Sequence, residues 1–558
     1  MAEFEREGRM MTEVDQRCYV AVRDLTLAGS CAETASRQVH ADLVSLSRAG
    51  ARPDGHAVDD RECACSRARI DARHHRRRRS PDSRAQPPGG REGVHRMKLA
   101  ILGGGGFRVP HVYEALLRDR GAPRVDEVWL HDTDAGRLRV MAAILAAIAE
   151  GTTNDTGAAG AAPPKVFTAT LLDRALEGAD FVFCAIRVGG AAGRVRDERV
   201  ALDLGVLGQE TTGPGGIAFG LRTIPVMTRI AHRIRAVAPD AHVINFTNPA
   251  GMITEAMQAV LGDRVLGVCD TPSGLGARVA AALGLDAARL RLDYVGLNHL
   301  GWTRRVLHDG TDVLPAVLAD DGLLGALEEG VVFGRDWLRD LGVIPNEYLY
   351  YYYFNREAVR ATRDAPRTRG EFLAARQAAF YERIAAAPGG AALRAWREAV
   401  ASRSASYMAE MKGAATGTEL ADHGAVDPVD EGYAGVAVKV MAAIGRDEPA
   451  TMILNVRNGP TVAELPPDAV VEVPTLVDAR GVHPLPPTPP DLHQTGLMQQ
   501  VKAVERLTIG AALTGSRAAA AQAFALHPLV DSVSVGRRLL DGYIDRIPEV
   551  AAVFEETR

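Results

Sequence analysis

An apolar strand, a run of glycines and a helix follow one another from Lys98, and this succession restricts the fold more than any other feature. Residues 98–102 form a short apolar run typical of a buried parallel strand, and 109–117 have the period of an amphipathic helix. A glycine turn at a helix N-terminus offers backbone N–H groups and the positive end of the helix dipole to a pyrophosphate. The pattern therefore predicts a dinucleotide-binding unit whose loop is Gly103, Gly104, Gly105 and Gly106.

The residues after this unit extend the same pattern. A second strand, expected over 127–131, ends at Asp132, whose carboxylate can accept hydrogen bonds from both ribose hydroxyls of NAD and would repel the 2′-phosphate of NADP. Strands are expected near 165–170, 181–186, 242–246 and 265–268, with helices such as 221–237 and 253–261 between them. This alternation predicts an α/β fold with a Rossmann-like, doubly wound parallel sheet and ligands at the carboxyl ends of its strands.

Polar side chains follow four successive strands, which suggests one shared crevice. A cysteine and a histidine on what would be adjacent strand ends can bind one divalent metal and leave positions open for substrate oxygens and water. Taken singly, a cysteine after a strand is more often a small buried hydrophobe, and a lone histidine an ordinary core or surface group. Spacing alone leaves both interpretations open for Cys269 and His299. The other polar residues at these strand ends are Arg187, Arg194, Asn248, Asp270 and Asn298.

Composition excludes several classes of partner. The formal charge of −5 over 558 residues gives no reason to expect nucleic acid, and no apolar run is long enough for a membrane span. Four of the six cysteines precede Met97, so the remainder holds only Cys184 and Cys269 and no disulfide framework. A reducing cytoplasm is the expected compartment.

The first 96 residues differ from the rest of the chain. Ten arginines lie between Arg67 and Arg96, and no hydrophobic period runs through the segment. It is either a basic arm for nucleic acid or targeting, or a disordered extension or mis-assigned start, and the second interpretation is favoured. The predicted division is therefore 1–96, an NAD-binding domain over 97–300, and an α+β domain over 301–558 that completes the active site and forms oligomer contacts.

From Met97 onward the chain resembles glycoside hydrolase family 4, the NAD- and metal-dependent glycosidases, which do not use the usual pair of carboxylates. The resemblance rests on an ordered series of segments over more than 400 residues. These are 101–106 (ILGGGG), 186–190 (IRVGG), 208–216 (GQETTGPGG), 245–249 (NFTNP), 267–270 (GVCD), 296–299 (GLNH), 345–349 (PNEYL), 453–458 (ILNVRN) and 465–473 (LPPDAVVEV).

The resemblance implies a fold like that of lactate and malate dehydrogenases and an activity, hydrolysis of 6-phospho-β-glucosides such as cellobiose 6-phosphate. The implied reaction oxidises C3 with NAD, removes the C2 proton, eliminates the aglycone, adds water and reduces C3 again. The implied metal is Mn²⁺, and the implied assembly is a homodimer or homotetramer. The implied roles are metal binding by Cys269 and His299, proton removal by Tyr348 with Tyr351 as second choice, cofactor contact by Arg187, and phosphosugar contact by Arg194, Asn248, Asn298 and Arg369.

Departures from the family pattern keep alternatives open. Gly106 stands where the family usually has Ser, which should not prevent NAD binding because backbone groups cradle the phosphates. Asp270 is typical of α-specific members, where it is a general acid, whereas the Thr211–Thr212 pair and the 187–190 segment are more like β-specific members. The β-glucoside is favoured, with a 6-phospho-α-glucosidase or α-galactosidase of the same family as alternative. An NAD-dependent 2-hydroxyacid dehydrogenase is the rival from another class; it would need no thiolate metal ligand and would survive a chelator.

Overall fold

The structure, a computed structural model, describes residues 97–156, 162–385, 389–405 and 432–555. The Arg-rich segment, for which two interpretations were given, lies outside these residues. The predicted boundary at residue 300 stays a prediction.

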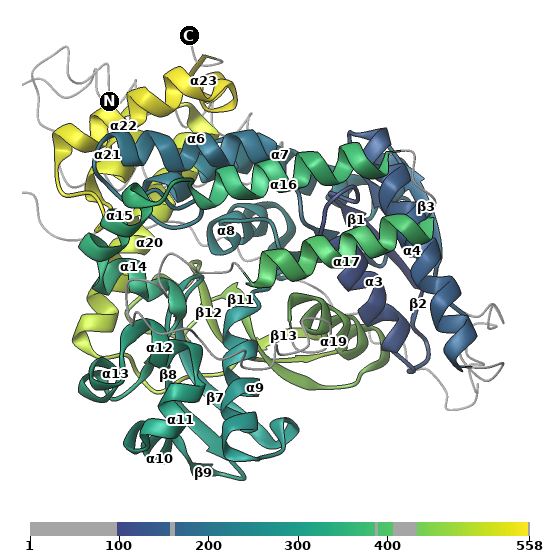
Figure 1. The fold of residues 1–558 in the computed structure, drawn as a ribbon, viewed down its shortest axis with the longest axis horizontal. Coiled ribbons are helices and arrows are strands. Elements are labelled where there is room, and N and C mark those ends of the chain that lie inside the picture. Colours follow the sequence, from purple (N-terminus) through teal and green to yellow (C-terminus); the bar gives the residue numbers. More distant parts are fainter. Residues whose placement is uncertain (1–96, 157–161, 386–388, 406–431, 556–558) are drawn as a thin grey trace, which may run out of the picture. The chain divides into compact units, whose positions relative to one another are not determined.

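Six parallel strands form one half of a single sheet (Figure 1). Their spatial order is β3-β2-β1-β4-β5-β6, the order of doubly wound dinucleotide-binding sheets. The strands are β1 (Met97–Leu102), β2 (Val125–His131), β3 (Lys165–Ala169), β4 (Phe181–Cys184), β5 (His242–Asn245) and β6 (Val265–Gly267). The predicted Rossmann-like sheet is confirmed.

Each central strand contributes to two hydrophobic cores because successive side chains point to opposite faces. In β1, Leu99 and Ile101 belong to one core, and Ala100 and Leu102 to the other. Helices cover both faces, as a parallel sheet requires. The first core includes α3 (Val109–Arg118), α4 (Ala135–Thr156), α9 (Thr271–Leu283) and α19 (Tyr433–Arg446); the second includes α5 (Leu172–Leu176), α7 (Pro214–Val237), α8 (Ala250–Leu261), α21 (Arg517–Leu526), α22 (Val533–Arg546) and α23 (Pro548–Glu555).

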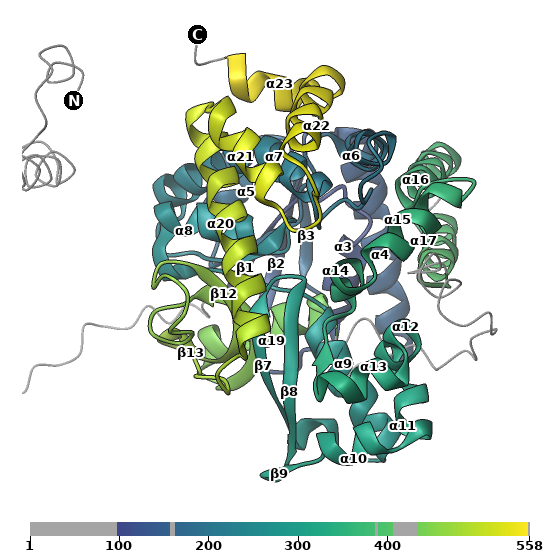
Figure 2. The ribbon, with the colours of Figure 1, turned by 90° about the vertical axis from the view of Figure 1, so that its left-hand side faces the viewer.

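The other half of the sheet is antiparallel and is assembled from segments far apart in the sequence. Beyond β6 the order is β11-β12-β7-β8-β10, while β13 pairs with β12 and β9 with β8, which makes 13 strands in the described part. In Figure 2, β7 and β8 extend away from the parallel strands toward β9, and α20 (Leu492–Thr514) runs beside them. The strands are β7 (Leu290–Leu297), β8 (Leu300–His308), β9 (Thr311–Asp312), β10 (Ile344–Pro345), β11 (Ala450–Arg457), β12 (Val470–Asp478) and β13 (Gly481–Pro484).

The direction of β7 contradicts the prediction that four successive strands end at the same edge of the sheet. β7 is antiparallel to β12, β12 to β11, and β11 to β6, so β7 runs opposite to β6. Cys269 and His299 therefore follow strands separated by two others, not adjacent strands. The prediction was wrong because β11 and β12, from residues 450–478, lie between β6 and β7. No local sequence pattern near Cys269 or His299 indicates that these distant strands are inserted there.

Helices from the C-terminal segment also reach the parallel half. α16 (Arg369–Ile384) packs on α6 (Gly190–Asp203), and α17 (Gly389–Ala405) packs on α4 and on α16 (Figure 1). A capping box starts α16: Thr368 Oγ1 accepts from Glu371 N, and the Glu371 carboxylate accepts from Thr368 N.

Short helices join β9 to α16. They are α10 (Leu314–Ala319), α11 (Asp321–Ala326), α12 (Glu328–Phe333), α13 (Arg335–Leu341), η5 (Glu347–Leu349), α14 (Tyr350–Tyr353) and α15 (Asn355–Asp364); η3 (Gly262–Arg264) and η4 (Ala287–Arg289) precede β6 and β7. Among the helices that the structure describes, none has both the length and the apolar character of a membrane span.

Candidate active site

The glycine run makes the tight turn between β1 and α3. Gly103 N and Gly104 N donate to His131 O at 2.9 and 2.7 Å, which ties the loop to the end of β2. Gly103 has a φ of +86°, and a Cβ there would lie 2.6 Å from Ala185 O. Only glycine fits this position, because it alone combines a left-handed backbone with no side chain.

Asp132 lies beside this loop, as predicted for a ribose ligand. Its Oδ2 accepts from Gly105 N at 3.0 Å and its Oδ1 from Asp134 N at 3.0 Å. Since a carboxylate offers about four acceptor positions, the two ribose hydroxyls of a dinucleotide can still be bound here. The loop and Asp132 thus fit the cofactor that the sequence suggested.

Aromatic side chains from the C-terminal segment hold the carbonyl groups of the same loop. Tyr381 donates to Gly105 O at 2.6 Å, Trp396 Nε1 to Phe107 O at 3.0 Å, and Tyr433 to Arg108 O at 2.9 Å. These three donors were not predicted from the sequence because each belongs to no motif and lies more than 270 positions downstream of the loop. Through them the second half of the chain fixes the backbone of the dinucleotide loop.

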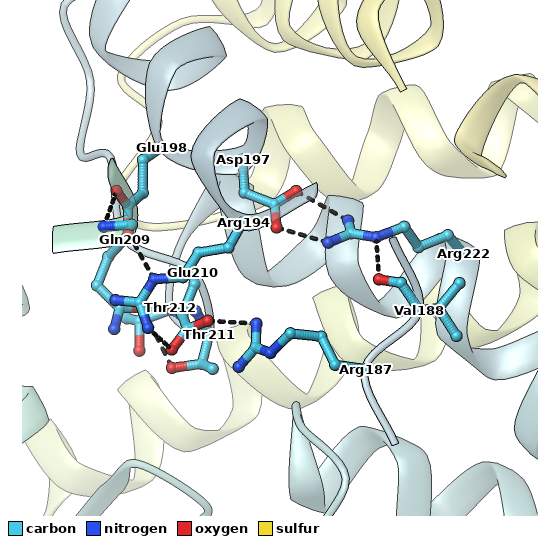
Figure 3. Close-up of polar contacts among 11 residues, drawn as sticks. Arg187, Val188, Arg194, Asp197, Glu198, Gln209, Glu210, Thr211, Thr212 and Arg222 are labelled. Atoms are coloured by element: carbon cyan, nitrogen blue, oxygen red, sulfur yellow. Dashed lines mark hydrogen bonds and ion pairs between the residues drawn. The ribbon is translucent and has the colours of Figure 1, made fainter. Parts of the chain in front are cut away.

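Two of the predicted arginines meet at one carboxylate after β4. Arg187 Nη1 lies 2.5 Å from Glu210 Oε2, and Arg194 Nη1 lies 2.5 Å from Glu210 Oε1 (Figure 3). Burial alone would raise the pKa of Glu210, but the two guanidinium groups lower it to about 2. Arg194 also pairs with Glu198 at 2.9 Å. Glu210 was present in the 208–216 motif, but no role was assigned to it.

A buried ion pair supports the turn that carries Arg187. Arg222 donates to both oxygens of Asp197, at 2.8 and 2.6 Å, and its Nε donates to Val188 O at 3.1 Å (Figure 3). Both side chains are fully buried, and Tyr543 donates to Asp197 O at 2.9 Å. Bidentate pairing satisfies the guanidinium and fixes the turn at Val188.

The loop after β5 presents Asn248. Asn245 holds this loop: its Nδ2 donates to the carbonyls of Thr247 and Ala250, and its Oδ1 accepts from Thr247 N. Asn248 Oδ1 is buried and has no hydrogen-bond partner among the described residues. Buried polar atoms are normally paired, so an orphan acceptor at a strand exit points to a donor supplied by a ligand.

Cys269 follows β6 and is buried, with 4% of its surface exposed. Burial, followed by the negative charges of Glu472 and Asp270, raises the pKa of its thiol well above the ordinary value. A cation beside the sulfur would favour the thiolate, the form that binds metal. Asp270 forms an ion pair with Arg108, whose Nη1 is 3.5 Å from Asp270 Oδ2. Arg108 was not among the predicted site residues.

His299 is presented by the two-residue turn of the β7–β8 hairpin, since Leu297 pairs with Leu300. Its φ of +61° is uncommon for a non-glycine residue, and such strain gathers at functional positions. Burial lowers the pKa of His299 to about 4, although Asp270 and Glu210 act in the opposite direction. The imidazole is therefore neutral near pH 7 and able to bind a metal.

Tyr348 lies directly against this histidine. The two rings stack with centroids 3.7 Å apart and planes 3° from parallel. The Tyr351 ring packs on Tyr348, with centroids 6.1 Å apart, and is itself buried. Stacking thus brings together one candidate metal ligand and the predicted base. Asn298 and His299 also line a cavity of ≈ 40 Å³ whose wall includes Thr211, Thr212 and Glu505.

Cys269 and His299 suit a divalent cation by donor chemistry, a thiol and a neutral imidazole. Within the part of the chain that the structure describes, no three His, Cys, Asp or Glu side chains form a complete metal-binding group. Cys269 and His299 alone would therefore hold the cation, and its other positions would be open to substrate oxygens and water.

Arg369 lies at the start of α16 against the end of α17. Its Nη2 donates to Arg403 O at 3.0 Å, and its guanidinium lies 5.5 Å from the centre of the Phe372 ring. Burial lowers the pKa of the Arg403 side chain to about 9, and the nearby charges of Arg108 and Arg194 act in the same direction. Arg403 therefore adds a buried guanidinium to the Arg187–Arg194 cluster. It was missed because it lies in an Ala-rich helix without a motif.

Comparison with known proteins matches both halves of the chain to one family. Residues 98–285 match the model described as Family 4 glycosyl hydrolase, and residues 294–530 match its C-terminal domain. A probable 6-phospho-beta-glucosidase of Bacillus subtilis (strain 168) is 30% identical over 455 residues, covering 80% of this chain and 96% of that protein. A 6-phospho-alpha-glucosidase of Leptotrichia buccalis is 29% identical over 468 residues, covering 81% and 98%.

Solved structures of this family are also similar to the chain. The 6-phospho-beta glucosidase from Thermotoga maritima, determined with NAD and glucose-6-phosphate, is similar with a TM-score of 0.68 and 26% identity, covering 81% of this chain and 99% of that one. A second structure of that enzyme, with manganese, NAD+ and glucose-6-phosphate, has a TM-score of 0.66. These matches favour the glycosidase over the hydroxyacid dehydrogenase.

Proposed function

The chain belongs to family 4 of the glycosyl hydrolases, and on that premise we propose that it hydrolyses 6-phospho-β-glucosides with NAD and a divalent cation, Mn²⁺ in the first place. The observation that carries this proposal is the stack of Tyr348 on His299. It puts a phenol, which can remove a proton, next to a residue that can bind a cation.

The 6-phosphate is assigned to the arginine cluster. The guanidinium groups of Arg187, Arg194 and Arg403 bring three positive charges, against two negative charges on Glu198 and Glu210. Guanidinium suits phosphate because its planar donors bind two oxygens at once and keep their charge. Arg369 supports the cluster through the backbone of Arg403.

The sugar hydroxyls are assigned to the groups between the cluster and His299. A hydroxyl that donates to Asn248 Oδ1 would satisfy the orphan acceptor. Asn298 lines the cavity beside His299 and is the second amide in reach of the sugar. In this proposal, Asn248 and Asn298 orient the sugar ring for proton removal by Tyr348.

When bound, NAD accepts and returns a hydride, and a divalent cation held by Cys269 and His299 serves as a Lewis acid. Tyr348 takes the proton from the sugar carbon, which calls for its deprotonated form. Arg194 interacts electrostatically with Tyr348. A nearby positive charge favours a phenolate.

The β anomer is favoured because the Thr211–Thr212 pair and the 187–190 segment are more like β-specific members. Asp270, the general acid of α-specific members, is engaged by Arg108, whose Nη1 lies 3.5 Å from Asp270 Oδ2. The α-glucosidase and α-galactosidase of the same family stay as alternatives. A homodimer or homotetramer belongs to the proposal, and so does a reducing compartment such as the cytoplasm, which the two buried, unbridged cysteines fit.

One assay tests the proposal on the full chain. Both anomers of nitrophenyl glucoside 6-phosphate, and the α-galactoside as a further substrate, are incubated with and without NAD, Mn²⁺ and a reductant. The expected result is cleavage of the β-glucoside only when NAD and Mn²⁺ are both present. Faster cleavage of the α anomer reverses the anomer assignment, and full activity after removal of NAD refutes the mechanism.

A further inference from the structure

One row of residues crosses the four strands between the two candidate metal ligands. Gly267 of β6 lies opposite Asn455 of β11, Asn455 lies opposite Glu472 of β12, and Glu472 lies opposite Gly296 of β7. Cys269 follows Gly267 by two positions, and His299 follows Gly296 by three. The row therefore joins the segments that carry the two ligands.

The row places two large polar side chains between two glycines. A Cβ at Gly267 would lie 2.9 Å from Asn455 Cβ, and one at Gly296 would lie 2.3 Å from Gly301 Cα. Both glycines are therefore needed for close packing of the strands. The space at Gly267 is used by Asn455 and Thr254, and the space at Gly296 by the backbone of Leu300 and Gly301.

Glu472 is a buried carboxylate with three donors, and its exposed fraction is 1%. Its Oε1 accepts from Asn455 Nδ2 at 2.9 Å and from Asn298 Nδ2 at 3.3 Å, and its Oε2 accepts from Tyr294 OH at 2.9 Å. Asn298 immediately precedes His299, so this arm holds the hairpin turn that presents the imidazole.

A second arm leads from the same carboxylate to Tyr348. Tyr294 OH accepts from Asn346 Nδ2 at 3.3 Å, and Asn346 Oδ1 accepts from Tyr348 N at 3.0 Å. Asn346 N donates to Gly301 O at 2.8 Å, which ties the same turn to β8. Glu472 is thus linked by hydrogen bonds to the backbone N of Tyr348 and to Asn298, the residue before His299.

We propose that Glu472 is a positioning residue for the reaction: it holds His299 and Tyr348 in register through these two arms and supplies the negative charge that favours a cation at Cys269 and His299. This rests on the proposed function. All three donors are neutral, and no ion pair of Glu472 occurs among the described residues. A buried carboxylate with neutral partners is costly, and a nearby divalent cation offsets that cost.

Electrostatics agree with this geometry. Burial raises the pKa of Glu472 to about 7, and its hydrogen bonds act in the opposite direction. The charge of Glu472 also raises the pKa of Cys269, so the two groups are within electrostatic reach. Partners of metal ligands commonly change metal affinity 10–100-fold when they are replaced.

The direct test is Glu472→Gln in the full chain, with Mn²⁺ affinity measured by titration calorimetry without substrate. The expected result is Mn²⁺ binding that is weaker by roughly 10–100-fold, with NAD affinity unchanged. The matched control is Glu255→Gln. Glu255 also accepts three hydrogen bonds, from Lys502 Nζ, Arg506 Nε and Val470 N. None of these donors lines the cavity beside His299; Lys502 reaches its wall only through an ion pair with Glu505. Glu255→Gln should lower stability and leave Mn²⁺ affinity as it is.

A second variant, Tyr294→Phe, keeps the charge and cuts the arm to Tyr348. We expect kcat to fall about 10-fold, with an altered pH profile and with Mn²⁺ affinity retained. Mn²⁺ binding by Glu472→Gln equal to that of the parent, or an equal loss in Glu255→Gln, overturns the inference and leaves the proposed function standing. A parent chain that binds no Mn²⁺ refutes the cation in the proposed function, and this inference with it.

Discussion

The parallel and antiparallel halves of the sheet contribute to the site by different means. The parallel half offers the backbone N–H groups of the 103–106 loop, ordered by β1, β2 and the start of α3, together with side chains at its strand ends such as Asp132 and Cys269. The antiparallel half offers side chains, His299 and Tyr348, whose positions depend on β11 and β12 from residues 450–478. Binding of the cofactor can therefore be separated experimentally from the chemistry on the sugar.

The largest expected effect is in the antiparallel half. Tyr348→Phe should lower kcat by roughly 10²–10⁴-fold, the usual contribution of a general base. NAD and Mn²⁺ affinity should persist, because phenylalanine retains the ring stack on His299. Steady-state kinetics with a nitrophenyl glucoside 6-phosphate measure this, and Tyr351→Phe is the control. A larger loss in the control would transfer the role to Tyr351.

The next effect concerns stability in the parallel half. Arg222→Leu leaves Asp197 buried without its partner, and we expect the free energy of unfolding to fall by about 3–5 kcal/mol. Urea unfolding of the variant measures the loss. Arg222→Leu combined with Asp197→Leu should recover part of it, and failure to recover any would mean that the other contacts of Arg222 dominate.

A smaller effect depends on pH and concerns His527, a buried residue after α21 that lines the cavity beside His299. Burial lowers the pKa of His527 to about 3 from an ordinary value of 6.5. Below pH 6.5 the imidazole of His527 is protonated in the unfolded chain but stays neutral in the folded chain. The free energy of unfolding therefore decreases as the pH falls from about 6.5 toward about 3, by up to a few kcal/mol. In His527→Asn the side-chain oxygen can still accept from Leu529 N. Urea unfolding at pH 7, 6 and 5 should show a shallower decline for this variant, and parallel curves would contradict the assignment.

The smallest expected effect is a difference in stability and NAD binding between alanine variants of two glycines in the parallel half. Gly103→Ala should cost about 1–3 kcal/mol from backbone strain and contact with Ala185 O, and should also weaken NAD binding. Gly178→Ala is the control, because its φ of +69° carries strain but no atom lies within 4 Å of an added Cβ. It should cost about 1 kcal/mol and bind NAD normally. Equal NAD affinity in both variants would remove the loop from the cofactor site.

Local patterns in the sequence were sufficient for the parallel half. The glycine turn, Asp132 and the alternation of strands and helices are each encoded within a few residues, because backbone conformation and side-chain period are local properties. The family motifs also named Cys269, His299 and Tyr348. They did not show that His299 occupies a hairpin turn on a strand opposed to β6.

Only the tertiary structure decided how the chemistry-bearing side chains meet. It placed β11 and β12 between the strands of Cys269 and His299, joined Arg187 and Arg194 through Glu210, and linked Glu472 to the His299–Tyr348 stack. The physical reason is that antiparallel pairing and buried polar networks join residues that are far apart in the sequence, such as Tyr294 and Glu472, which are 178 positions apart. Such contacts depend on the packing of the whole chain and have no period or turn chemistry that a local reading could detect.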